Sequence, residues 1–240
     1  MQRIRSLVFI ATCTLWTLAF TPVLLIIWFA GRREAWVRSA SRVWARGVLL
    51  ALKWIVGLDY VERGRHNIPV APCLIVANHQ STWETIAFLV LLPDVAIVAK
   101  RELLSVPIFG WFLRRSPMIV IDREGGSKAV RRMLEESSAA LSQGRSVLIF
   151  PEGTRSAPMA RVEFKRGVEL LYAKLGCAVL PVSLNSGHYW RRGQSSKRAG
   201  TVTVSYLNAI TAGLPAQVAM KQAEQSIQEE LHQLQSAKRI

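Results

Sequence analysis

The chain of 240 residues has few of the residues that build covalent or metal-based frameworks. Its three cysteines, Cys13, Cys73 and Cys177, lie far apart and form no CxxC pair, which excludes a disulfide scaffold and a zinc module of the usual spacing. We therefore expect a reducing compartment. The sequence also shows no internal repeat, no low-complexity segment and no metal-ligand spacing, so we expect neither a metal nor a cofactor.

Acidic residues are scarce as well. The chain has 16 Asp and Glu against 31 Lys and Arg, which gives a formal net charge of +15. Such a surplus indicates a nucleic acid, an anionic membrane surface or an acidic partner. Zinc-finger spacing and RRM-like aromatic signatures are both missing, so we expect no nucleic acid. Residues 1–65 hold ten Lys and Arg against three Asp and Glu, which favours anionic lipid headgroups near the N-terminus.

The first thirty residues contain a long apolar run. Ser6–Ala30 spans 25 residues without a charge, and roughly 20 apolar residues suffice to cross a bilayer. The run exceeds the apolar core of a signal peptide, and no small-x-small cleavage site follows it. Pro22 and the break at Gly31 also permit a helical hairpin that enters one leaflet and returns. A simple span and a hairpin both stay open.

The stretch Trp36–Ile55 shows apolar residues at spacings of three and four, with arginines on the remaining face. Such an amphipathic helix can lie at the headgroup level, with its tryptophans in the interface. The arginines can equally be a positive-inside topology signal without a binding role. Both interpretations place these arginines on the cytoplasmic side, so we expect a cell-membrane protein whose catalytic domain lies on that side. We expect residues 1–57 to be membrane-anchoring helices and residues 58–240 to form one domain.

Short aliphatic runs alternate with helical patterns after residue 58. The expected strands are Cys73–Ala77, Val95–Ala99, Met118–Ile121, Val147–Phe150, Val179–Leu184 and Thr201–Tyr206. The expected helices are Thr82–Leu92, Ser127–Ser142, Glu163–Leu175 and Pro215–Ser236. We expect surface loops at Ser156–Val162 and Arg191–Gly200. The alternation predicts an α/β fold, with a central sheet flanked by helices.

A histidine and a carboxylate lie across a strand-to-helix turn. His79 follows an apolar strand, and Glu84 comes five residues later. Neutral imidazole is a good general base, and a carboxylate that accepts its second N–H fixes the tautomer. The segment Ser81–Glu84 also reads S-x-x-E, a capping box in which Glu84 would cap its own helix. Both roles stay open for Glu84.

Basic residues recur where strands end or helices begin. The segment Phe150–Ser156 follows a strand and offers a glycine for close backbone approach, a threonine hydroxyl and an arginine fork. Each of these segments also fits an exposed surface turn. Together they predict that several cations converge on one anion. The further basic residues of this kind are Lys100, Arg101, Arg123 and Lys165.

These segments, in this order, resemble the glycerolipid acyltransferase family, and most closely its bacterial 1-acyl-sn-glycerol-3-phosphate acyltransferases. The family's Asn-His-x4-Asp motif is matched by Asn78, His79 and Glu84, with glutamate in place of aspartate. Its Phe-Pro-Glu-Gly-Thr-Arg-Ser motif is matched letter for letter by residues 150–156. The resemblance covers about residues 60–190. The other matching positions are Lys100, Arg101, Arg123, Phe164, Lys165, Gly167 and Val179–Val182.

The resemblance implies a single acyltransferase domain with a mixed sheet at the bacterial inner membrane. It implies acyl transfer from a thioester, on acyl carrier protein or coenzyme A, to the 2-hydroxyl of lysophosphatidate. His79 would be the general base and Glu84 would orient it. The implied substrate-binding residues are Lys100, Arg101, Arg123, Glu152, Gly153, Thr154, Arg155 and Lys165, of which Glu152 is expected to order its loop.

Two alternatives remain from the sequence. The same chemistry could act on another acceptor, such as a lyso-ornithine lipid or another lysophospholipid. The protein could also bind lipid without catalysis, with Glu84 serving only as a helix cap.

Overall fold

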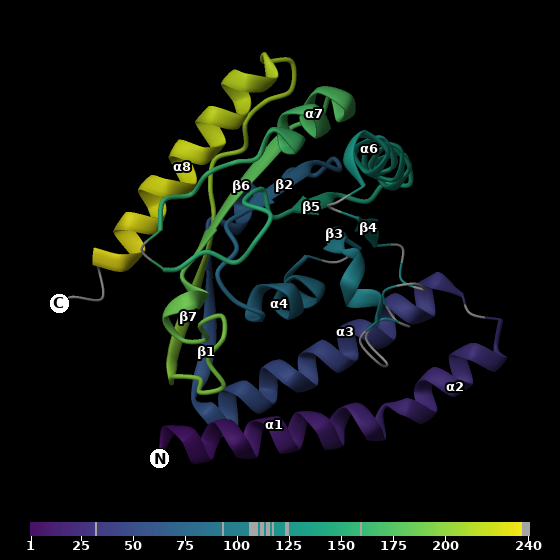
Figure 1. The fold of residues 1–240 in the computed structure, drawn as a ribbon, viewed down its shortest axis with the longest axis vertical. Helices are drawn as coiled ribbons and strands as arrows, with labels where there is room; N and C mark the ends of the chain where they lie inside the picture. The colour runs from purple at the N-terminus through teal and green to yellow at the C-terminus, as the bar shows by residue number, and fades with distance from the viewer. Residues whose placement is uncertain are drawn as a thin grey trace.

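The computed structural model describes residues 1–31, 33–92, 94–105, 110, 113, 116, 118–122, 125–158 and 160–236. Seven strands form one sheet in the order β1-β7-β6-β2-β5-β3-β4 (Figure 1). Among these described strands, only β6 and β7 pair antiparallel, so the sheet is mixed. The strands are β1 (Leu58–Arg63), β2 (Leu74–Ala77), β3 (Ala96–Lys100), β4 (Ile119–Ile121), β5 (Val147–Ile149), β6 (Val179–Leu184) and β7 (Gly200–Tyr206). The α/β fold predicted from the alternation is confirmed.

Helices cover both faces of the sheet (Figure 1). The first face carries α1 (Gln2–Ala19), α3 (Glu34–Ala51), the π-helical turn η1 (Leu52–Val56) and α4 (Trp83–Leu91). The second face carries α6 (Gly126–Ser142), α7 (Arg166–Leu175) and α8 (Ala216–Ser236). Helix α2 (Thr21–Phe29) continues α1 and packs on α3. The 3-10 turns are η2 (Arg65–Asn67), η3 (Arg101–Ser105) and η4 (Ser186–His188).

Strand β1 was not among the expected strands. It forms the edge of the sheet, and Asp59, Glu62 and Arg63 interrupt its apolar pattern. An edge strand with one exposed face has a weaker hydrophobic signal than a buried one, and its pairing with β7 joins residues far apart in sequence.

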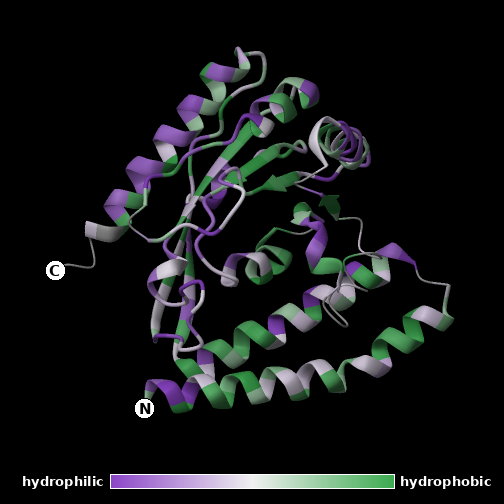
Figure 2. Cartoon of the chain, in the orientation of Figure 1, coloured by the Kyte–Doolittle hydropathy of each residue, from purple (hydrophilic) through white to green (hydrophobic). Residues whose placement is uncertain are grey.

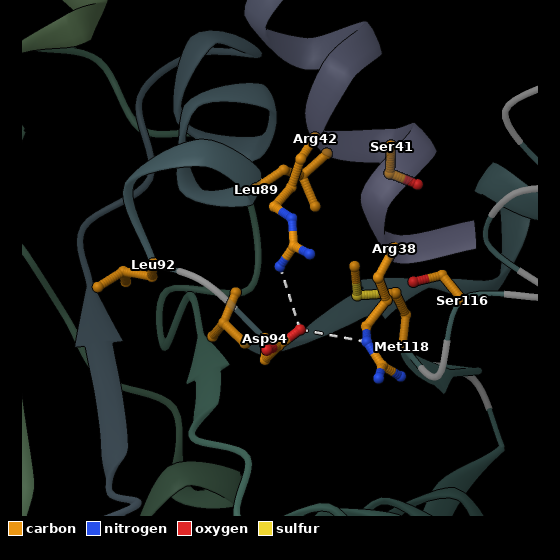
Figure 3. A pocket seen from close by; sticks show the side chains of 9 residues that line it. Arg38, Ser41, Arg42, Leu89, Leu92, Asp94, Ser116 and Met118 are labelled. Atoms are coloured by element: carbon orange, nitrogen blue, oxygen red, sulfur yellow. Dashed lines mark hydrogen bonds and ion pairs between the residues drawn. The ribbon is translucent and has the colours of Figure 1, made fainter. Parts of the chain in front are cut away.

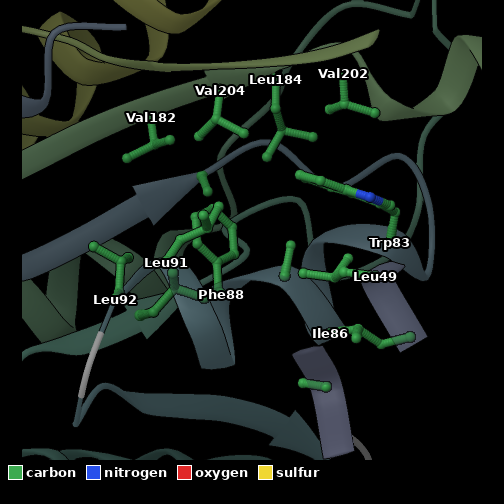
Figure 4. Close-up of a cluster of buried hydrophobic side chains, with 14 of the residues drawn as sticks. Leu49, Trp83, Ile86, Phe88, Leu91, Leu92, Val182, Leu184, Val202 and Val204 are labelled. Carbon is green, nitrogen blue, oxygen red and sulfur yellow. The ribbon is translucent and has the colours of Figure 1, made fainter. Parts of the chain in front are cut away.

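Helix α4 is held in the core of the first face. Its Trp83, Phe88 and Leu91 are buried against side chains of β6, β7 and α3 (Figure 4). Burying each large apolar side chain stabilises the fold by about 1.5–3 kcal/mol. The start of α4 is therefore fixed by packing in the core, and this packing also positions the loop that connects β2 to α4.

The N-terminal helices pack along α3 and leave one side uncovered. Leu24 and Ile27 of α2 lie against Val37 and Ala40 of α3. The apolar segment Gln2–Phe29 is long enough to cross a membrane, yet only 17% of its most apolar window is buried. Figure 2 shows α1 and α2 as largely hydrophobic ribbons. The exposed large side chains on this segment are Ile4, Leu7, Val8, Ile10, Leu15, Leu18, Leu25, Ile26, Trp28 and Phe29.

A buried lysine ties α1 to the loop before β7. The Lys197 ammonium lies 5.1 Å from the ring centroid of Phe9 and 4.7 Å from that of Trp190. The backbone N–H of Lys197 donates to the Ser6 hydroxyl at 2.8 Å. The expected surface loop at Arg191–Gly200 is therefore wrong at Lys197, which is 4% exposed, because two aromatic rings stabilise its charge away from water.

Helix α3 is tied to the sheet through Asp94, in the connection between α4 and β3. The Asp94 carboxylate lies 3.2 Å from both the Arg38 and the Arg42 guanidinium groups, beside a cavity of about 20 Å³ (Figure 3). Asp94 also has a φ of 59°, a left-handed conformation that asparagine and aspartate tolerate best among non-glycine residues. This carboxylate links the N-terminal helices to the sheet.

Replacing Asp94 with asparagine keeps the shape and the backbone preference but removes the charge between the two arginines. We expect a loss of roughly 1 kcal/mol, which lowers the Tm by about 2–4 °C for a chain of this size. Thermal unfolding in detergent micelles measures the change. The control is Glu135→Gln, which removes an isolated ion pair with Arg131 on the exposed face of α6 and should leave the Tm nearly unchanged. Equal Tm values for both variants would contradict the link.

Candidate active site

The carboxyl ends of five parallel strands, β6, β2, β5, β3 and β4, meet at one edge of the sheet. In α/β sheets, ligands bind at this edge, where the strands run into loops. His79 follows β2, the segment 150–156 follows β5, and Lys100 ends β3. The order of the strands thus places the loop after β5 directly beside the loop that carries His79.

His79 and Glu84 are in contact. The Nδ1 atom of His79 lies 2.9 Å from Oε1 of Glu84, and the two side chains are 14% and 0% exposed. The His79 ring stacks on Phe150, with 4.2 Å between ring centroids and 21° between planes. The glutamate in place of the family's aspartate therefore still reaches the imidazole. Because Nδ1 faces Glu84, Nε2 is the ring nitrogen on the opposite side from that contact.

Glu84 makes the contacts that both of the roles left open by the sequence would need. Its Oε1 accepts the backbone N–H groups of Gln80 and Ser81, each at 2.6 Å, which is the capping interaction. Burial alone would raise the pKa of the Glu84 carboxyl, but the hydrogen bonds from His79, Ser81 and Ser186 outweigh it and hold the pKa below its usual value. An ionised carboxylate can only accept hydrogen bonds, so the Nδ1–H group of His79 is the donor in its contact with Glu84.

Hydrogen bonds join the loop after β5 to the loop that carries His79. The buried Glu152 accepts the backbone N–H of His79 at 2.6 Å, and the Ser156 backbone N–H donates to the His79 carbonyl at 2.8 Å. Arg155 donates from Nη1 to the Thr82 hydroxyl at 2.8 Å. Burial raises the pKa of the Glu152 carboxyl. Because the Glu152 carboxylate accepts a hydrogen bond from the backbone of His79, its position supports the expected role of ordering the loop.

Three cations gather around this loop. Gly153 has a φ of 69°, and a Cβ built there would lie 3.2 Å from Cδ, Cε and Nζ of Lys165, so the lysine side chain lies across the glycine. Arg192 donates from Nη1 to the Thr154 hydroxyl at 3.0 Å. In the described part of the chain, none of Arg155, Lys165 and Arg192 forms an ion pair with a carboxylate.

Arg192 was missed by the sequence analysis. It lies in the polar run before β7, 38 residues from Thr154, and no motif includes it. The only signal in the sequence is the pair of neighbouring arginines at 191 and 192. Its place beside the loop after β5 depends on how the connection between β6 and β7 folds over the sheet edge.

Lys100 and Arg101 lie at the same edge but further along it, because β5 separates β2 from β3. Both are paired with carboxylates, Lys100 with Glu102 and Arg101 with Asp122. No hydrogen bond or ion pair within the described ranges joins either cation to His79. Arg123 lies outside the described residues. The role of these three residues in binding stays a prediction.

No group of three or more His, Cys, Asp or Glu in the described ranges is placed to hold a metal ion. Cys73 is buried, and burial raises the pKa of its thiol to about 11, which keeps it protonated at neutral pH. The titratable and basic side chains that the structure brings together at this edge are His79, Glu84 and the three cations around Gly153.

Comparison with known proteins identifies relatives of this arrangement. A family model described as Acyltransferase matches residues 60–185. The chain is 38% identical over 167 residues to the 1-acyl-sn-glycerol-3-phosphate acyltransferase of Pseudomonas aeruginosa, covering 70% of this chain and 65% of that protein. It is 31% identical over 170 residues to the human 1-acyl-sn-glycerol-3-phosphate acyltransferase beta, covering 69% of this chain and 61% of that protein.

A solved structure also matches. The crystal structure of the 1-acyl-sn-glycerophosphate acyltransferase PlsC from Thermotoga maritima superposes with a TM-score of 0.79 and 25% identity, covering 98% of this chain and 96% of that chain. The matches to the two curated relatives span less than two thirds of their length. The family model covers residues 60–185, more than half of the chain, and includes His79, Glu84 and Arg155. The chain belongs to the Acyltransferase family.

Proposed function

We propose that this protein moves a fatty acyl group from a thioester to the 2-hydroxyl of 1-acyl-sn-glycerol 3-phosphate, giving phosphatidic acid. The observation that carries the proposal is the His79–Glu84 contact at 2.9 Å beside three cations that lack carboxylate partners among the described residues. The His79–Glu84 contact would supply a general base with its orienting carboxylate. The three cations are suited to binding a phosphate monoester. The curated relatives carry the name of this reaction.

In the proposed reaction, Nε2 of His79 takes the proton of the acceptor hydroxyl as its oxygen attacks the thioester carbonyl. The new C–O bond forms, the C–S bond breaks, and the imidazolium returns its proton to the departing thiolate. Glu84 stabilises the positive charge on His79 while it exists. A thiol is far more acidic than an alcohol, so the leaving group needs little assistance. No covalent acyl-enzyme is required.

The acceptor's phosphate would be held by Arg155, Lys165 and Arg192 around the Gly153–Thr154 turn. An arginine fork can bind two phosphate oxygens at once, and a lysine adds a mobile point charge. Gly153 has no side chain of its own, so the backbone at this turn could approach the anion closely beside the Lys165 ammonium. The predicted residues Lys100, Arg101 and Arg123 would extend this positive region along the sheet edge.

Replacing Arg155 with alanine should lower kcat/KM for lysophosphatidate about 100-fold, mostly through KM, because a charge-assisted contact to the phosphate is lost. Steady-state kinetics in mixed micelles measures both constants. The control is Arg63→Ala, which removes an exposed arginine at the carboxyl end of β1. Because β1 and β7 run antiparallel to β6, this end of β1 lies at the opposite end of the strands from the candidate site. An unchanged KM in the Arg155 variant would remove this arginine from the phosphate site.

We further propose that the protein acts at the cytoplasmic face of the cell membrane. The uncovered apolar sides of α1 and α2 would enter the lipid, while α3 stays tied to the sheet through Asp94. This arrangement favours a hairpin lying in one leaflet over a simple span, because a crossing segment would have to leave its contacts along α3. Anionic headgroups would meet the basic N-terminal region.

The acyl donor would be a thioester of acyl carrier protein or of coenzyme A. Both donors are negatively charged, and the surplus of basic residues would attract either one.

Purified protein in mixed micelles, supplied with lysophosphatidate and each donor in turn, tests the proposal through the formation of phosphatidic acid. Product with one donor and not the other identifies the donor. Product only with a lyso-ornithine lipid or another lysophospholipid would replace the proposed acceptor. Folded protein that acylates none of these acceptors would favour lipid binding without catalysis.

A further inference from the structure

The second oxygen of Glu84 has partners that the proposed mechanism does not use. Oε1 faces His79 and the two backbone N–H groups, whereas Oε2 accepts the Ser81 and Ser186 hydroxyls, each at 2.7 Å. Five donors therefore saturate the carboxylate, which is 0% exposed. Every route by which this side chain could rotate breaks at least one of these bonds.

Ser186 comes from a distant part of the chain. It opens the 3-10 turn η4 after β6, 102 residues beyond Glu84, and is itself 0% exposed. No sequence motif singled it out. Its hydroxyl is the only group outside the 79–84 loop that donates to this carboxylate among the described residues.

The neighbours of Ser186 hold it in place. The side-chain amide of Asn78 pairs with both the N–H and the carbonyl of Leu184, each at 2.9 Å. The Gly187 backbone N–H donates to Oε1 of Gln80 at 3.1 Å, and a Cβ built at Gly187 would lie 2.8 Å from Cβ of Gln80. The turn after β6 therefore fits closely against the His79 loop, and the Ser186 hydroxyl cannot move away without disturbing both.

We propose that Ser186 is a positioning residue, which holds Oε2 of Glu84 so that Oε1 stays directed at Nδ1 of His79. The inference rests on the proposed function, because it assigns the serine a part in preparing the general base. A hydrogen bond to a charged group in a buried site is worth more than one between neutral groups, and loss of Ser186 leaves Oε2 with the Ser81 hydroxyl as its one donor among the described residues. The carboxylate of the variant turns more freely, and His79 is oriented less well.

The kinetic test is Ser186→Ala, compared with Ser183→Ala. Ser183 is equally buried, lies on β6, and bonds only to the Ile227 carbonyl of α8 in the described structure. Ser186→Ala should lower kcat about tenfold with KM for lysophosphatidate within about twofold, because the lost bond acts on the base and not on substrate binding. Ser183→Ala should leave both constants unchanged. Equal losses in the two variants would reduce Ser186 to a packing residue.

A double-mutant cycle separates positioning from packing. In a Glu84→Gln background there is no carboxylate to orient, so adding Ser186→Ala should change kcat less than about twofold. A packing defect would cost the same tenfold in both backgrounds, and that result would overturn the proposal.

The NMR resonance of the His79 Nδ1–H proton tests the positioning role of Ser186 without an activity measurement. In protein labelled with ¹⁵N-histidine, the Nδ1–H proton of His79, assigned through His79→Ala, should shift in Ser186→Ala and stay unchanged in Ser183→Ala. An unshifted resonance in Ser186→Ala overturns the positioning role. Wild-type protein that acylates no acceptor would instead overturn the proposed function, and the resonance would still report whether Ser186 orients the dyad.

Discussion

His79→Ala is expected to lower kcat for the acylation of lysophosphatidate about 10³- to 10⁴-fold, because no other group replaces the proton acceptor at Nε2. The fold should survive, since the ring is partly exposed and stacks on Phe150 at the edge of the core. Formation of phosphatidic acid by purified protein in mixed micelles measures the effect.

The matched control for this variant is His232→Ala. His232 lies on the exposed side of α8 and bonds to Gln228 one turn away. We expect wild-type activity from it. Phosphatidic acid formed at the wild-type rate by His79→Ala would mean that the base lies elsewhere, and the mechanism proposed here would be wrong.

Glu84→Gln should lower kcat on the order of 10³-fold while leaving the protein folded. Glutamine has the same shape, its carbonyl can accept the N–H groups of Gln80 and Ser81, and its amide can donate to the hydroxyls of Ser81 and Ser186. The cap of α4 is thereby kept. What is lost is the negative charge that stabilises the His79 cation.

Two measurements on Glu84→Gln distinguish its roles. The Tm should fall by only a few degrees, because the hydrogen bonds are retained, whereas acyl transfer nearly stops. A variant that unfolds would show that the charge is chiefly structural. A folded variant with unchanged turnover would leave Glu84 as a helix cap alone.

The Glu84 carboxylate also predicts how the stability of the fold depends on pH. The pKa of Glu84 lies below its ordinary value, so the charged form is the stable one in the folded protein. Its contribution to stability is present above the unfolded pKa and is lost as the pH falls through the lower folded value.

The local sequence was enough to predict the elements of the sheet centre. The runs that became β2, β5 and β6 are short, aliphatic and bounded by turn residues, and a buried strand needs no more than this to be recognised. The loop that carries His79 and the loop at 150–156 were predicted for the same reason, since each directly follows such a run. Edge strand β1 was missed because charged residues interrupt its apolar pattern and only Leu58 of its side chains is fully buried.

Residues that act through distant partners were beyond the reach of the sequence. Arg192 reaches Thr154 across 38 positions and Ser186 reaches Glu84 across 102. Lys197, in the loop before β7, reaches Phe9 of α1. None of them belongs to a periodic pattern or a motif, and each is placed by the packing of one loop against another. Their partners could be named only from the folded chain.

By itself, the sequence determined the α/β class, the apolar N-terminus and the placement of a histidine and an acidic residue across a helix start. The tertiary structure decided that Glu84 both caps α4 and contacts His79, because one carboxylate has enough lone pairs to serve the backbone and the ring at once. It also decided which cations stand free beside the loop after β5 and which are paired with carboxylates. These outcomes depend on the order of strands in the sheet, and strand order is set by long-range packing that no local pattern encodes.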